Sequence, residues 1–212
     1  HAGDTITTGS NNTIIGYDAD VNSADAENRI AIGKEASCTE DNTAQIGNTS
    51  VTKLNVGTNL TLGGDTDNNT FIGKNALAAN TTGEDNTASG SNALAANTTG
   101  DNNTAIGKDA LRYFVAGNNT AIGGDAMQGV NGSSTGSNNV AIGYYALRNT
   151  TTGQLNIAIG VETLDGNSTG SYNVAVGKGA MGNNTTANYN TAIGQESLLG
   201  NTTGTKNTAN PF

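Results

Sequence analysis

The stretch NTAIGKDALRYF, residues 103–114, is central to the fold because close copies of it recur through the sequence. Most copies begin with Asn, a β-branched residue, Ala and Ile, and each closes on a glycine. The closing glycines of the longer series are Gly73, Gly90, Gly107, Gly123, Gly143, Gly160, Gly177 and Gly194. Their successive separations are 17, 17, 16, 20, 17, 17 and 17 residues, and a fixed period of this kind indicates a repeat architecture.

A second glycine, at the end of Asn-Thr-Thr-Gly or a variant, precedes the next closing glycine by seven residues. The single 20-residue spacing is therefore an insertion in one turn, around MQGVNGSS, residues 127–134, which a stack of coils tolerates. We expect each repeat to be one coil with two short strands, the first through Asn-Thr-Ala-Ile and the second through Ala-Leu. Glycines would supply the positive φ angles at the corners. The prediction is an all-β repeat solenoid, a parallel β-roll with coils of about 17 residues.

Stacked coils align equivalent residues, and one Asn precedes each first strand. Side-chain amides in such a column can hydrogen-bond from coil to coil, as they do in other stacked-strand structures. The predicted structural ladder consists of Asn69, Asn86, Asn103, Asn119, Asn139, Asn156, Asn173, Asn190 and Asn207.

The first strand is apolar on both of its sides, because alternate residues of a strand face opposite ways. One side carries Ala88, Ala105, Ala121, Ala141, Ala158, Ala175 and Ala192. The other side carries Ile72, Ile106, Ile122, Ile142, Ile159, Val176 and Ile193. A strand with one face in water shows polar alternate residues, so we expect the coil to cover one side and a further chain to cover the other. The sequence therefore predicts an elongated homo-oligomer.

Residues 1–47 carry weaker copies of the element, with glycines at Gly16, Gly33 and Gly47. The stretch that follows, residues 48–64, mixes Val and Leu with Thr, Asn and Lys in the manner of an extended strand. We expect a first short β-roll stack over 1–47 and an extended connector over 48–66, where chains could wrap. A longer stack over 67–212 would follow, cut off in its last repeat.

The NTAIG and NNVAIG elements resemble the head repeats of trimeric autotransporter adhesins, and the form with NTTG is similar to repeats in phage tail fibres. This resemblance implies a homotrimer of left-handed parallel β-rolls, located outside the cell on a bacterial surface or on a virion. It also implies attachment to a host surface protein or glycan. The alternatives are a structural spacer that holds a separate receptor-binding tip and, less favoured, an ice- or polysaccharide-binding solenoid that uses the Thr-Thr pairs.

Charge and motif content exclude several other functions. The net charge of −9 argues against a nucleic-acid partner, and no apolar run is long enough for membrane insertion. His1 is the only histidine, Cys38 is the only cysteine, and no nucleophile, phosphate-binding or Cys/His metal motif is present. We therefore expect no enzyme activity, no catalytic residue, no metal ligand and no cofactor.

Several residues have a second, functional interpretation. The acidic stretch GGDTDNN, residues 63–69, resembles a calcium loop in composition but lacks the glycine–aspartate nonapeptide of calcium-binding β-rolls. Asp109, Asp125 and Glu162 are interpreted as solvated turn residues rather than catalytic ones. The aromatics of ALRYFVAG, residues 110–117, and YYAL, residues 144–147, are expected to fill a widened coil or an interface rather than to stack on sugars.

Overall fold

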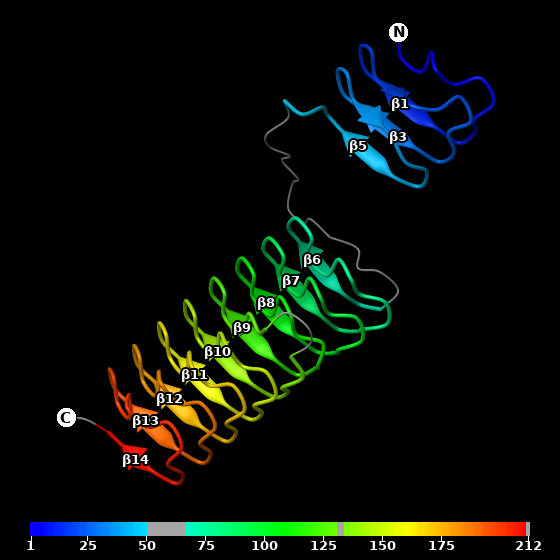
Figure 1. Ribbon diagram of the computed structural model, residues 1–212. Helices are drawn as coiled ribbons and strands as arrows, with labels where there is room; N and C mark the ends of the chain where they lie inside the picture. Colours follow the sequence, from blue (N-terminus) through cyan, green and yellow to red (C-terminus); the bar gives the residue numbers. More distant parts are fainter. Residues whose placement is uncertain (51–66, 131–133, 211–212) are drawn as a thin grey trace. The chain divides into compact units, whose positions relative to one another are not determined.

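The computed structural model describes residues 1–50, 67–130 and 134–210. The chain divides into two compact units, His1–Thr61 and Leu62–Phe212, and each unit is a stack of coils (Figure 1). The predicted connector and the acidic stretch both fall mainly in 51–66, outside the described residues.

The first unit contains two parallel sheets. β1 (Thr13–Ile15), β3 (Ile30–Ile32) and β5 (Ala44–Ile46) pair in that order. β2 (Asp20–Val21) and β4 (Ser37–Cys38) pair with each other. The first two coils of this unit thus contribute two strands each, as predicted.

The second unit contains one nine-stranded parallel sheet, in which each strand pairs with the strands before and after it in the sequence (Figure 1). Equivalent residues lie opposite each other, as Ala105 lies opposite Ala121. This register confirms the predicted parallel solenoid with coils of about 17 residues. The strands are β6 (Thr70–Ile72), β7 (Thr87–Ser89), β8 (Thr104–Ile106), β9 (Thr120–Ile122), β10 (Val140–Ile142), β11 (Ile157–Ile159), β12 (Val174–Val176), β13 (Thr191–Ile193) and β14 (Thr208–Ala209).

The second strand predicted through Ala-Leu is wrong for the second unit, where this segment forms turns. Ala110 and Leu111 are both fully buried, although they are adjacent in the chain. A strand would send them to opposite faces, whereas the left-handed backbone at Leu111, with φ of 51°, turns both side chains inward. At the corresponding segment of the first unit the buried residues lie two positions apart, as Ala19 and Val21 do, and that spacing suits a strand.

The glycines of each coil serve two different purposes. The closing glycines have positive φ, as predicted, and Gly160 has φ of 132°. Gly153, at the end of the Thr-Thr-Gly turn, is instead required for space, because an added Cβ would lie 2.5 Å from the carbonyl oxygen of Gly170. Successive coils therefore approach each other closely at two places, the closing glycine and the glycine of the Thr-Thr-Gly turn.

We expect Gly160→Ala to lower the free energy of unfolding by about 3 kcal/mol, because its methyl group would combine a strained φ with a collision. The added Cβ would lie 2.8 Å from the carbonyl group of Gly177. Gly200→Ala is the matched control, since a Cβ there meets nothing within 4 Å. Urea denaturation monitored by circular dichroism measures both, and equal stabilities would contradict the prediction.

Candidate interaction surface

The predicted Asn ladder runs through the interior of the second unit, where the side chains from Asn69 to Asn190 are at most 1% exposed. The Asn156 Nδ2 donates hydrogen bonds to the Gly170 carbonyl (2.8 Å) and to Asn139 Oδ1 (3.1 Å). Its Oδ1 accepts from the backbone N–H (3.0 Å) and the Nδ2 (3.1 Å) of Asn173. These side chains hold adjacent coils together and leave no polar group free for a ligand at this position.

A second Asn ladder lies at the start of the Asn-Thr-Thr-Gly turns, which the sequence interpretation had treated as turns alone. Asn97 Nδ2 donates to the Gly100 carbonyl (3.0 Å) and to Asn80 Oδ1 (3.2 Å). Asn184 Nδ2 donates in the same way to Asn167 Oδ1 (2.8 Å). A signal was present in the sequence, because Asn recurs at this position of the turn in most coils, at Asn80, Asn97, Asn167, Asn184 and Asn201.

Phe114 takes the place of the second-ladder Asn in one coil and is fully buried. A Cβ added to Gly129, in the next coil, would lie 3.0 Å from two atoms of the Phe114 ring and 2.6 Å from Ser134 Oγ. The chain therefore passes directly over the ring in the coil that holds the insertion. The expectation that an aromatic side chain fills a widened coil is confirmed for Phe114.

The Thr-Thr pairs also bond within the stack. The hydroxyl of Thr81 donates to the Thr98 carbonyl (2.8 Å), and that of Thr185 donates to the Thr202 carbonyl (3.3 Å). Thr151 donates to the Ser168 carbonyl (3.0 Å). The first hydroxyl of these pairs thus links one coil to the next.

The outer face of the nine-stranded sheet is the main exposed apolar surface of the second unit. The middle residues of β7–β13 are Ala, at most 1% exposed, so the Ala side is the one that the coil covers. The third residue of each strand faces outward, and Ile72, Ile106, Ile122, Ile142, Ile159 and Ile193 are between 36% and 58% exposed. Val176 is half-buried at the same position. In the single chain nothing covers this second apolar side.

The first residue of each strand also faces outward, and its character changes along the stack. It is Thr in β6–β9, aliphatic in β10–β12, where it is Val140, Ile157 and Val174, and Thr again in β13 and β14. Among the described strands of this sheet, the first and third residues are therefore both aliphatic only in β10–β12. The first unit shows a related surface, on which Ile15, Ile30 and Ile46 are exposed.

Two columns of residues border this outer face. The entry column lies two residues before each strand and consists of Asn68, Asp85, Asn102, Asn118, Asn138, Leu155, Tyr172, Tyr189 and Lys206, all with φ between 56° and 63°. The exit column lies two residues after each strand and consists of Lys74, Ser91, Lys108, Gly124, Tyr144, Val161, Lys178 and Gln195. Left-handed backbone costs an ordinary L-residue about 1–2 kcal/mol but suits Asn and Asp. The exceptions in the entry column are therefore Leu155, Tyr172, Tyr189 and Lys206.

Tyrosines gather beside the outer face. Tyr172 and Tyr189 stack with ring centroids 4.8 Å apart and planes 10° apart. Tyr144 stacks on Tyr145 with centroids 3.8 Å apart, and the Arg148 guanidinium lies 4.0 Å from the centre of the Tyr145 ring. Tyr144, Tyr172 and Tyr189 nevertheless remain about half exposed.

The description of Asp109 as a solvated turn residue is wrong, because its side chain is buried. It pairs with Lys108 and Arg112 (3.1 Å) and accepts a hydrogen bond from Asn92 Nδ2 (3.0 Å). Burial raises the pKa of the Asp109 carboxyl, but the bonds from Lys108 and Asn92 and the charge of Arg112 outweigh it and hold the pKa below its usual value. Asp109 therefore stabilises its coil as an anion, whereas Glu162 is exposed as expected.

A small hollow of about 150 Å³ opens on the corner turns, where Gly179 and Gly182 lack the side chains found in neighbouring coils. Glu162 and Asp165 line it on one side and Leu199 lines it as well. Burial raises the pKa of the Asp165 carboxyl, the Glu162 charge adds to this, and Arg148, whose Nη2 donates to it at 3.0 Å, opposes it. Asp165 is thus already engaged in an ion pair at this hollow.

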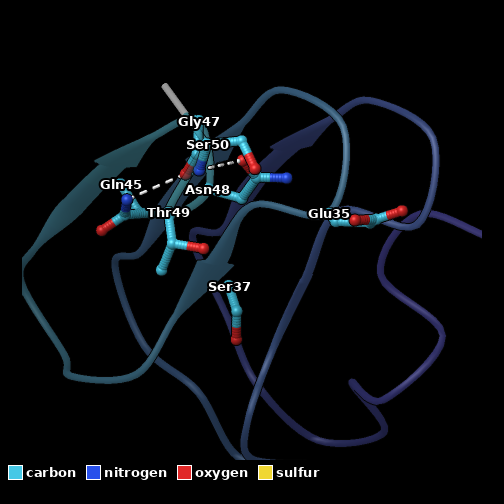
Figure 2. Close-up of a pocket in the computed structure, with 7 residues that line it drawn as sticks. All are labelled: Glu35, Ser37, Gln45, Gly47, Asn48, Thr49 and Ser50. Atoms are coloured by element: carbon cyan, nitrogen blue, oxygen red, sulfur yellow. Dashed lines mark hydrogen bonds between the residues drawn. The ribbon is translucent and has the colours of Figure 1, made fainter. Parts of the chain in front are cut away.

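A larger hollow of about 410 Å³ lies on the first unit beside β5, the last strand of its sheet (Figure 2). Its lining is polar, and Gln45 Nε2 donates to the Gly47 carbonyl (2.8 Å) while the Ser50 N–H donates to Asn48 Oδ1 (2.9 Å). In Figure 2 Glu35 and Ser37 lie across from these residues. The hollow is formed where the described coils of the unit end.

The described ranges contain no helix with the length and apolar character needed to cross a membrane. In the same ranges no three His, Cys, Asp or Glu side chains converge in a way that could ligate a metal ion. No model of a known protein family, no curated protein and no solved structure matches the chain.

Proposed function

We propose that this chain is a segment of an extracellular homotrimeric fibre that mediates attachment to a surface. The observation that carries the proposal is the outer sheet face, whose Ile side chains remain more than one third exposed along the second unit. A contiguous apolar surface of this kind marks a site of association in soluble proteins. The resemblance of the repeats to adhesin heads and tail fibres supplies the extracellular location and the attachment role.

Another copy of this chain is the partner that fits the face best. The exposed rows repeat once per coil, at the spacing of paired strands, about 4.8 Å. A partner that covers them along the whole sheet needs the same axial repeat, which a second copy has. Copies that run parallel about a common axis also place the aliphatic rows of β10–β12 opposite each other. That the assembly has three chains is taken from the resemblance of the repeats to trimeric adhesin heads.

A structural spacer that holds a separate tip is the second candidate. The spacer role is favoured because hydroxyls on the surface turns are engaged within the stack. Those of Thr81 and Thr151, for example, donate hydrogen bonds to carbonyls of the next coil. In this role the repeats provide length and rigidity, and recognition occurs elsewhere.

Light scattering on the purified chain tests the assembly. A trimer has three times the chain mass of 21.2 kDa, which is 63.6 kDa, and a mass of 21.2 kDa would overturn the assembly. Arrays of host glycans and of cell-surface proteins then separate the two roles. Saturable binding on either array supports attachment, whereas a trimer that binds neither supports the spacer and overturns attachment.

A further inference from the structure

We infer that Leu155 and Tyr172 form an edge contact between neighbouring copies of this chain, packing against Tyr144 and Val161 of the adjacent copy, while Tyr189 supports Tyr172 by stacking on its ring. The inference rests on the proposed self-assembly and adds a second contact to it. The outer sheet faces would meet at the centre of the assembly, and the entry column of one copy would meet the exit column of the next.

The combination of left-handed backbone and exposure at these three residues argues for a contact outside the single chain. Every other residue of the entry column before Lys206 is Asn or Asp, the types that accept a left-handed backbone. Leu155, Tyr172 and Tyr189 have φ of 56°, 60° and 58° and are 43%, 49% and 55% exposed. Strained positions that hold exposed apolar side chains point to a contact made outside the coil.

These residues continue the apolar outer face to its edge. In the coil of β11, four alternate residues face outward and are between 38% and 43% exposed: Leu155, Ile157, Ile159 and Val161. The equivalent residues in the coil of β7 are Asp85, Thr87, Ser89 and Ser91. The apolar surface is therefore widest in the coils that carry the strained residues, and at β11 it reaches both edges.

The two edges complement each other in a ring. Rotation about an axis parallel to the stack brings the entry edge of one copy against the exit edge of the next, a heterologous contact that closes. Tyr144 and Val161 on the exit edge are 47% and 41% exposed, and they flank β10 and β11. Leu155 and Tyr172 on the entry edge precede β11 and β12. Leu155 is therefore at the level of Val161 and one coil from Tyr144, and Tyr172 is one coil from Val161.

Charge follows the same pattern in the earlier coils. Asp85 lies on the entry edge and Lys74 lies on the exit edge one coil before it, whereas Lys108 on the exit edge is paired with Asp109 of its own chain. Opposite charges on facing edges favour the correct neighbour. Asp85 and Lys74 therefore agree with the proposed pairing of the two edges.

A polypeptide edge fits this surface better than a carbohydrate does. Tyr172 and Tyr189 each cover one ring face of the other, which removes faces on which a sugar ring could stack. The nearest polar groups are also engaged, because Ser171 Oγ accepts from the Gln154 N–H (3.1 Å) and Asn188 Oδ1 accepts from the Ser171 N–H (2.7 Å). The side chains that remain exposed on this edge, Leu155, Tyr172 and Tyr189, present mainly apolar atoms.

Disulfide cross-linking tests the contact directly. In a Cys38→Ala background, we would prepare Leu155→Cys with Val161→Cys and, separately, Tyr172→Cys with Val161→Cys. Residues 155 and 161 lie about 20 Å apart along one strand direction, too far to bridge within a chain. We expect oxidation of at least one pair to give a covalent species of three chains on a denaturing gel. No intermolecular bond from either pair, or dimers from the single-cysteine variants, would overturn the edge contact.

A triple variant separates this contact from the assembly as a whole. Leu155→Asn, Tyr172→Asn and Tyr189→Asn together restore the residue type found in most other coils, so the circular dichroism spectrum should be unchanged. We expect the concentration of half-dissociation to rise at least tenfold, measured by analytical ultracentrifugation. Tyr113→Asn, on a corner turn away from both edges, is the control. A monomeric parent protein would refute the proposed assembly, whereas equal dissociation of parent, control and triple variant would refute the edge contact alone.

Discussion

Asn156→Ala should lower the free energy of unfolding by about 5 kcal/mol, because the substitution leaves one buried backbone group without a partner and removes three further hydrogen bonds. The Asn173 N–H loses its acceptor, whereas the Gly170 carbonyl loses the Asn156 amide but still accepts from Asn167 Nδ2. The unpaired N–H costs about 2 kcal/mol, and the lost bonds to Gly170, to Asn139 and from the Asn173 amide cost about 1 kcal/mol each. Urea denaturation of the purified protein measures the change.

Asn183→Ala is the control for this substitution, since Asn183 is exposed on a turn of a neighbouring coil. We expect it to change the stability by less than about 0.5 kcal/mol. If the two variants unfold at the same urea concentration, the ladder contributes nothing beyond a surface Asn, and the structural role assigned to it is wrong.

Ile159→Asp is expected to convert the proposed trimer into single chains. Ile159 lies at the centre of the aliphatic part of the outer face, so each copy would bury a carboxylate beside two others. An unpaired charge in an apolar interface costs several kcal/mol, and a loss of about 5 kcal/mol corresponds to assembly weakened about 10⁴-fold. Light scattering over a dilution series measures the change.

Thr186→Asp places the same charge on an exposed turn, and Ile159→Val keeps the outer face aliphatic. Both variants should retain the mass of the parent protein. A trimer that survives Ile159→Asp would show that the outer face is not where the copies meet. The circular dichroism spectrum of the variant checks that the coil itself remains folded.

The spacing of the closing glycines was sufficient to predict parallel coils, because a covalent repeat places the same residue at the same point of each turn. The alternation of Ala and Ile also predicted that both sides of the strand are apolar, but only the structure shows that the Ala side faces the interior of the coil. The second Asn ladder was missed for a different reason. Asn in a Thr-Thr-Gly turn is ordinary in an exposed loop, and only the fold shows that Asn97 and Asn184 are buried.

The strand predicted at Ala110 and Leu111, which is a turn in the structure, shows the limit of prediction from the local sequence pattern. Two adjacent apolar residues are compatible with a strand that is buried on both faces and equally with a left-handed turn that points both inward. The choice depends on where the core lies, which the other coils determine. Asp109 is a similar case, since its partners Asn92 and Arg112 come from the coil before it and from its own turn.

The printed sequence was thus enough to derive the coil length, the stacking of like on like, the glycine corners and the two apolar sides of the strand, all of which follow from periodicity along one chain. The inward direction of the alanines, the left-handed turn at Leu111, the second ladder and the two columns that border the outer face became apparent only in the folded chain. The ladder connects residues about seventeen positions apart in adjacent coils, and the two columns place residues six positions apart on opposite edges of the sheet. Such neighbours are defined by packing in three dimensions, and no spacing along the chain distinguishes them from residues that never meet.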